Sequence, residues 1–374
     1  MILLHIILML SVLMFAVAFN NRFPRKQTIL ILVLVVFALA GIGASIVPKD
    51  NYDLARHYQV IERVRKSSYT LGSFLSKGYT ITSSNYRYTY LFNVLIYIVA
   101  RWFPNQALPF IAIFITYILF VSVLLREFED SDLNNKNILL SFSIFLVLLP
   151  FLYVYSGIRN ALASTIVGYG LYRFFKNKKF FIFAFCSICA VLIHPVAIAV
   201  IPFIVLSKYS PSVIGLIITL VIPSLLNPVI EFVRLHVHND FLFGIAAKYY
   251  NYTMVRVDNQ GRVFLYSPII VLVIIIINVV WNQKKKRMPD ADNKYSLANL
   301  FVWYSAFSLG YFKNYSMITR LPYSIAVLSP VIVNEVLSYH CVKSELKQIV
   351  RIVTIGSILF IAALGLYENI MWLV

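Results

Sequence analysis

Residues 28–47 read TILILVLVVFALAGIGASIV, a continuous apolar stretch without a charged side chain. A helix of about 20 such residues crosses the ~30 Å hydrocarbon layer of a bilayer. A second run at 264–281, FLYSPIIVLVIIIINVVW, has the same character. Only helices or closed barrels span lipid, because backbone polar groups have no water partners there. Both runs are uniformly apolar rather than alternating, so they predict membrane-spanning helices.

The whole chain has the composition of an integral membrane protein. Of its 374 residues, 60% are hydrophobic and 13% are charged, which is about half the charged fraction of a soluble domain. We expect an all-α, polytopic transmembrane bundle of about 11 to 13 spans, forming one integral membrane domain over residues 1–374. The predicted spans are 1–19, 27–47, 107–125, 138–155, 160–175, 179–193, 196–206, 213–232, 263–281, 295–312, 320–338 and 349–366.

We interpret the positive charge of the chain as a sign of its orientation in the membrane rather than of a nucleic-acid partner. The formal net charge is +18, and short basic loops carry much of it, at 20–26, 176–179, 284–287 and 343–351. Lys and Arg concentrate in cytoplasmic loops, so these four loops are placed inside the cell. Both termini then face outward.

Two long segments, 48–106 and 233–262, therefore lie on the outer side. The apolar run within the first, residues 91–103, is short, and we expect it to form a juxtamembrane or re-entrant helix in the outer leaflet. The same sidedness requires a turn at His194–Pro195, which divides a long apolar run into two short helices. The alternative is one long tilted span there, with 213–232 re-entrant instead.

Several chemistries are not expected. The chain has three cysteines, and Cys186 and Cys189 lie three apart within an apolar run, a pattern more typical of helix packing than of a redox site. His236-x-His238 is weak evidence for a metal without further ligands. No Walker A motif or glycine-rich nucleotide loop occurs in the sequence. We predict no disulfide, no metal and no cofactor.

An acidic motif follows the span at 27–47 directly. If residues 50–58 are helical, Asp50, Asp53 and His57 share one face, and Leu54, Tyr58 and Ile61 form an apolar stripe beside them. One interpretation is structural, with Asp50 as the N-cap and Asp53 in the first turn. The other is catalytic, with one carboxylate as a general base.

Two further ionisable groups lie at membrane depth. Arg159 is at a span junction on the predicted outer side, where the positive-inside bias disfavours it. It either reaches lipid headgroups or grips a diphosphate by paired hydrogen bonds. His194 either packs between helices or, beside Pro195, faces a polar cavity.

The second outer segment and a late span add aromatic and basic side chains. The aromatic residues are suited to bind sugars, or form an interfacial belt. Arg320 is also placed on the outer side. Together these residues suit an anionic ligand reached from outside. The residues singled out as binding candidates are Lys248, Tyr249, Tyr252, Arg256 and Arg320.

The order of these motifs resembles the EpsG family of exopolysaccharide proteins, which is similar to Wzy-type polymerases. The resemblance covers about 50–323 and more distantly extends to GT-C glycosyltransferases of lipid-linked sugars. It is carried by Asp50-x-x-Asp53-x-x-x-His57-Tyr58, Tyr90-Leu91-Phe92-Asn93-Val94-Leu95, Ser156-Gly157-Ile158-Arg159-Asn160-x-Leu162-Ala163, Leu192-Ile193-His194-Pro195, Lys248-Tyr249-x-x-Tyr252 and Arg320.

The resemblance implies a glycosyltransferase that polymerises undecaprenyl-diphosphate-linked repeat units into exopolysaccharide, capsule or O-antigen. It would act at the outer face of the bacterial cytoplasmic membrane. Asp53 or Asp50 is the expected base, with His194 as an alternative. The expected substrate-binding residues are Arg159, Arg320, Lys248, Tyr249, Tyr252, Arg256, Tyr58 and Arg56.

Expected partners are the lipid-linked oligosaccharide, membrane lipids, and flippase and chain-length regulator proteins, without nucleic acid. The alternatives are a transporter or flippase for a lipid-linked or anionic substrate, and a polysaccharide ligase or acyltransferase.

Overall fold

The structure, a computed structural model, is mostly helical in the part of the chain that it describes and has no strand there. The described residues are 25–48, 53–81, 89–128, 138, 141–142, 145, 149, 151–236, 240–250, 297–311, 317, 320–321 and 323–331. The chain divides into two compact units, Met1–Ile198 and Ala199–Val374, and each is described by itself. The single integral membrane domain stays a prediction.

Three described helices are long and apolar enough to cross a membrane. They are α2 (Arg25–Ser45), α6 (Ala107–Glu127) and α12 (Val213–His236), which match the predicted spans at 27–47, 107–125 and 213–232. The all-α membrane fold is therefore confirmed. The predicted spans at 1–19, 263–281 and 349–366 lie outside the described residues, and those at 138–155 and 320–338 are described only in part.

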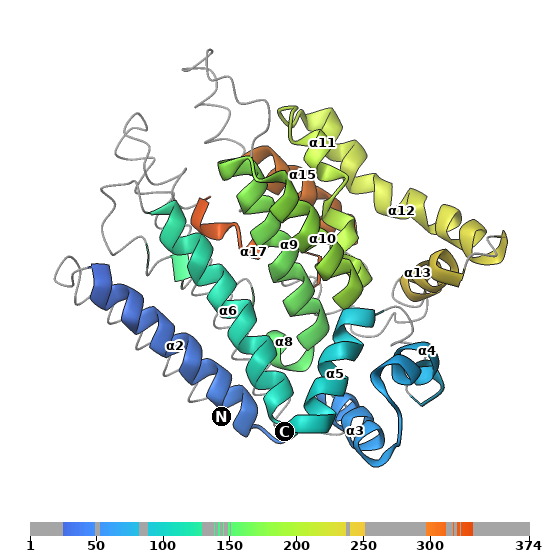
Figure 1. Cartoon of the computed structure of the whole chain (residues 1–374). Helices are drawn as coiled ribbons and strands as arrows, with labels where there is room; N and C mark the ends of the chain where they lie inside the picture. Colours follow the sequence, from blue (N-terminus) through green and yellow to red (C-terminus); the bar gives the residue numbers. More distant parts are fainter. Residues whose placement is uncertain are drawn as a thin grey trace, which may run out of the picture. The chain divides into compact units, whose positions relative to one another are not determined.

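Helix α9 (Ile158–Asn177) is the central helix of the first unit. It packs against α6 on one side and α10 (Phe180–Ile193) on the other, and α2 covers α6 (Figure 1). The α9–α10 contact is close: a Cβ atom at Gly170 would lie 2.7 Å from the Cβ atom of Cys186. Cys186 is thus a packing residue of this interface, as its position within an apolar helix predicted.

A tight turn makes α9 and α10 an antiparallel hairpin. Lys178 adopts the left-handed conformation with φ 55°. The amide of Lys179 donates to the Arg173 carbonyl at 3.1 Å, and the amide of Lys178 donates to the Phe174 carbonyl at 3.1 Å. This bond pattern satisfies carbonyls that the helix end leaves open. The hairpin returns the chain to the end of the unit where α9 began.

Helix α10 ends where the sequence predicted a turn. His194 is extended, with φ −154° and ψ 121°, and a 3₁₀ helix, η2 (Pro195–Val200), follows it. Proline disfavours helical backbone at the preceding residue and lacks an amide donor, which explains the break. A short helix, α11 (Phe203–Leu206), follows in the second unit.

Residues 53–81 and 89–102 include the helices α3 (Asp53–Lys66), α4 (Leu71–Ile81) and α5 (Tyr90–Trp102). Helices α3 and α5 are about 20 Å long, too short to span a bilayer, and their juxtamembrane position stays a prediction. They pack on each other. Leu54, His57 and Ile61 form the buried face of α3, so Leu54 and Ile61 lie in the protein core rather than on the membrane.

The second unit is built on α12. Helices α13 (Asp240–Tyr250) and α15 (Leu297–Leu309) pack on it, and a short helix α17 (Tyr323–Ala326) follows (Figure 1). Pro223 and Pro228 lie within α12. Next to Pro223, the chain after α15 approaches so closely that a Cβ atom at Gly310 would lie 2.3 Å from the Leu220 carbonyl oxygen.

Candidate active site

The N-terminal turns of three helices meet in the first unit. His57 is in the second turn of α3, Phe92 in the first turn of α5, and Arg159 in the first turn of α9. The His57 and Phe92 ring centroids are 5.0 Å apart, and the Arg159 guanidinium carbon is 5.6 Å from the Phe92 centroid. Because a helix N-terminus carries partial positive charge, this convergence favours an anion.

The start of α9 strengthens that preference. Gly157 is the N-cap and makes no side-chain capping bond, and the first turn has no acidic residue. The Arg159 side chain is instead buried there, with the residue 8% exposed. A cation at this end opposes the helix dipole, and burial of a charge costs free energy. An anion bound beside the start of α9 would interact favourably with both the helix N-terminus and the guanidinium.

Asn160 supplies a buried amide beside Arg159. The residue is 5% exposed, and neither its side-chain nitrogen nor its oxygen has a hydrogen-bond partner in the described structure. A buried polar atom left without a partner costs about 1–3 kcal/mol. The Asn160 amide is therefore available to a ligand as both donor and acceptor.

The buried His57 imidazole is held neutral. Its pKa lies well below the ordinary value of 6.5, because burial lowers it most and the Arg159 and Arg56 charges lower it further. A neutral imidazole has one donor and one acceptor nitrogen. The sequence placed His57 on the face shared with Asp50 and Asp53 but gave it no role. The spacing alone does not reveal that Arg159 lies near it.

Asp53 occupies the first turn of α3, where a carboxylate suits the helix dipole. Its Oδ1 accepts from Arg56 at 3.3 Å, with the Asp53 and Arg56 side chains 39% and 53% exposed. Tyr58 is half-buried, burial raises its pKa to about 12, and its hydroxyl bonds to no described residue. Asp50 lies outside the described residues.

His194 returns to the same end of the unit as Arg159, because α9 and α10 are antiparallel. It is 4% exposed, and its Nδ1 accepts the backbone N–H of Val196 at 3.2 Å. The neutral ring then carries its proton on Nε2. This geometry explains how a histidine is accommodated at the end of an apolar helix.

The second unit holds a separate polar cluster. The Tyr249 hydroxyl is 2.5 Å from the Tyr311 hydroxyl and 3.4 Å from Asn227 Oδ1. The Arg234 guanidinium lies over the Tyr250 ring at 4.0 Å. Asn227 and Tyr311 belong to this cluster, and neither was a candidate from the sequence.

The other candidates of the second unit are only partly described. Lys248 is a residue of α13, and Tyr252 and Arg256 lie outside the described residues. Arg320 is in a short turn, half-buried, and its amide donates to the Met317 carbonyl at 3.1 Å. Among the described residues, no group of three or more His, Cys, Asp or Glu side chains is placed to hold a metal ion.

These features define an all-α integral membrane protein in which a buried arginine, Arg159, lies where helix ends meet. The sequence model of the EpsG family matches residues 26–372, and the chain belongs to this family. Membership supports a role of the polysaccharide-polymerase type in general. No curated protein and no solved structure matches the chain.

Proposed function

We propose that the chain is a glycosyltransferase that polymerises undecaprenyl-diphosphate-linked oligosaccharide repeat units at the outer face of the bacterial cytoplasmic membrane. The product would be exopolysaccharide, capsule or O-antigen. The observation that carries the proposal is the buried pair of Arg159 and Asn160 in the first turn of α9, where α3 and α5 also begin. Family membership supports the polymerase class.

The reaction joins two lipid-linked chains. An acceptor hydroxyl oxygen forms a bond to the anomeric carbon of the donor sugar, and the bond from that carbon to the diphosphate oxygen breaks. The diphosphate leaves with the electron pair, and the hydroxyl proton goes to a base. Catalysis therefore requires a base for the hydroxyl and cations or donors for the charge developing on the diphosphate.

The diphosphate is assigned to the start of α9. The planar guanidinium of Arg159 can donate two parallel hydrogen bonds to phosphate oxygens, and the Asn160 amide can donate a third. The helix N-terminus adds its partial positive charge. Arg320, Lys248 and Arg256 are proposed as further substrate-binding residues.

The base is assigned to Asp53, with Asp50 and His194 as alternatives. A carboxylate in the first turn of α3 lies one helical turn from His57, which contacts the same phenylalanine ring as Arg159. His57 is a weaker base because its pKa is lowered, so it is assigned a hydrogen-bonding role toward the substrate. The aromatic and basic residues Arg56, Tyr58, Tyr249 and Tyr252 are proposed to bind sugar units of the substrate.

Purified protein in liposomes with a lipid-linked repeat unit tests the proposal. A ladder of longer lipid-linked products is expected. Movement of the substrate across the bilayer without a new glycosidic bond would instead identify a transporter or flippase. A single added group would identify a ligase or acyltransferase. Flippase and chain-length regulator proteins, the expected partners, can then be added to the same liposomes.

A further inference from the structure

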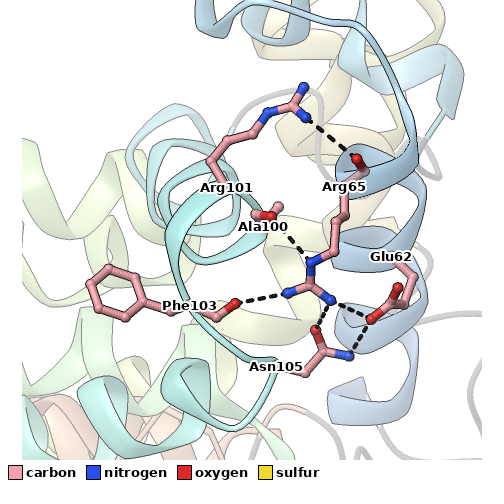
Figure 2. Close-up of polar contacts among 6 residues, drawn as sticks. All are labelled: Glu62, Arg65, Ala100, Arg101, Phe103 and Asn105. Atoms are coloured by element: carbon pink, nitrogen blue, oxygen red, sulfur yellow. Dashed lines mark hydrogen bonds and ion pairs between the residues drawn. The ribbon is translucent and has the colours of Figure 1, made fainter.

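The C-terminal ends of α3 and α5 are joined by two arginines, each of which bonds to the opposite helix. The Arg65 side chain, from α3, donates to the Ala100 carbonyl at 3.2 Å and the Phe103 carbonyl at 2.8 Å, both at the end of α5 (Figure 2). The Arg101 side chain, from α5, donates to the Ser67 carbonyl at 2.9 Å and the Tyr69 carbonyl at 2.7 Å, just beyond α3. We call this pair the arginine clasp.

Two side chains hold the Arg65 guanidinium in place. It pairs with Glu62 and donates to Asn105 Oδ1 at 2.9 Å. The Asn105 amide donates to the same Glu62 oxygen at 2.8 Å, which closes a ring of three bonds (Figure 2). Asn105 lies just before α6, so the clasp also ties α3 to the start of that helix.

The arginine clasp places positive charge at two adjacent helix C-termini. The last carbonyls of a helix have no partner within it, and they carry partial negative charge. In α3 and α5 these two ends lie side by side, so their charges repel. Arg65 donates to the Ala100 carbonyl in the last turn of α5, and Arg101 donates to the Arg65 carbonyl in the last turn of α3 at 3.4 Å. The two guanidinium charges thus lie at the negative ends of both helices.

The same geometry fixes the candidate site. Because both C-termini meet at the clasp and His57 meets Phe92 near the other end, α3 and α5 run parallel. His57 is eight residues before Arg65, and Phe92 is nine before Arg101, which corresponds to roughly 12–14 Å along each helix. Any slip of α3 along α5 at the clasp moves His57 along the Phe92 ring.

We propose that Arg65 and Arg101 are positioning residues that set the register of α3 against α5 and thereby the placement of Asp53 and His57 relative to Arg159. The proposal rests on the proposed function for its catalytic consequence. It also assigns a structural use to two outer-side arginines that would otherwise count as further phosphate ligands.

The test compares Arg65→Gln and Arg101→Gln with the control Arg63→Gln. Arg63 is exposed and lies in α3, as Arg65 does. Polymerisation by protein in liposomes gives kcat and KM for the lipid-linked unit. A misplaced site should lower kcat about 10- to 100-fold while KM changes by less than about threefold. Arg65→Lys, which keeps the charge but not the forked donors, should recover part of the rate. Arg63→Gln should match the wild type.

A second readout is independent of activity. The Phe92 ring shifts the nuclear magnetic resonances of the His57 ring, and histidine-labelled protein reports their positions, assigned with His57→Gln. Both clasp variants should move these resonances and Arg63→Gln should not. If Arg65→Gln does not fold, Asn105→Ala, which removes one bond from the guanidinium, takes its place.

The outcomes separate the two proposals. Folded clasp variants that keep both the wild-type kcat and the His57 resonances overturn the positioning role. Equal losses in kcat for Arg63→Gln and the clasp variants also overturn it, because charge rather than register would then matter. Wild-type protein that makes no ladder overturns the proposed function alone, and displaced His57 resonances would still support the clasp.

Discussion

The Arg159 guanidinium acts on the buried His57 imidazole: after burial, it is the largest cause of the lowered pKa of that ring. The two residues come from α9 and α3, and both contact Phe92 of α5. The guanidinium and the neutral imidazole therefore lie together at the N-terminal turns of α9 and α3. The donors of the Arg159 guanidinium, the helix N-terminus and the Asn160 amide, which has no partner among the described residues, are the basis for proposing a diphosphate there.

Loss of the guanidinium is the first test of that placement. Arg159→Gln should reduce polymerisation at least about 100-fold, because a donor aimed at the developing charge contributes about that factor. Arg159→Lys should retain little of the activity, since an ammonium cannot donate two parallel bonds to phosphate. The measurement is the ladder of lipid-linked products formed by purified protein in liposomes.

Arg173 provides the matched control for this prediction. It lies near the other end of α9, where its guanidinium donates to the Tyr169 hydroxyl at 2.9 Å. Arg173→Gln removes an equal charge from the same helix and should leave polymerisation within about threefold of the wild type. Equal losses in Arg159→Gln and Arg173→Gln would show that net charge, not the α9 N-terminus, is required.

The lowered pKa of His57 predicts that the folded protein loses stability in mild acid. The unfolded chain binds a proton at His57 near pH 6.5 and the folded protein does so only at lower pH. The contribution of neutral His57 to the free energy of unfolding is therefore fully present above about pH 6.5, and it is lost as the pH falls below that value. Thermal unfolding between pH 5 and 8 should show a larger acid loss for the wild type than for His57→Gln.

Asp53 was assigned both a catalytic and a helix-stabilising interpretation, and one substitution distinguishes them. Asp53→Asn keeps the shape of the side chain but removes the base, so polymerisation should fall by about 100-fold or more. The ion pair with Arg56 is exposed, so stability should change by less than about 1 kcal/mol. Product ladders and thermal unfolding measure the two effects separately.

Glu231 is the control for Asp53. It pairs with Arg234 three residues further along α12 at 3.8 Å, with its side chain 44% exposed. Glu231→Gln removes a similar carboxylate from a similar pair and should change neither property strongly. If Asp53→Asn still polymerises at the wild-type rate, the base lies elsewhere, with Asp50 and His194 the next residues to change.

The long helices were predictable because span length and apolar composition are properties of a continuous stretch. The run at 28–47 predicted α2, and the break at His194–Pro195 followed from the charge of the surrounding loops. Span length and loop charge are read directly from the sequence, and they do not depend on which helices the segment packs against.

The site was only partly predictable. Arg159 was found by a local rule, since a cation at a span junction on the outer side is unusual. The role of His57 depends on α5 and α9, which the chain brings beside α3 only on folding. Arg65 and Arg101 gave no signal at all, because a basic residue in the last turn of a helix is ordinary.

The close approach of α9 and α10 gives a last prediction, on stability. In Gly170→Ala the new methyl group would lie 2.7 Å from the Cβ atom of Cys186, so the helices must separate and the free energy of unfolding should fall by about 1–3 kcal/mol. Gly41 of α2 is the control, because a Cβ atom there meets nothing within 4 Å, and Gly41→Ala should stabilise by up to about 1 kcal/mol.

Cys186→Gly removes the atom that the new methyl group of Gly170→Ala meets. The double variant should therefore lose less free energy of unfolding than the two single variants lose in sum. Thermal unfolding in detergent measures the four variants and the wild type, and simple additivity would show that these two residues do not limit the approach of the helices.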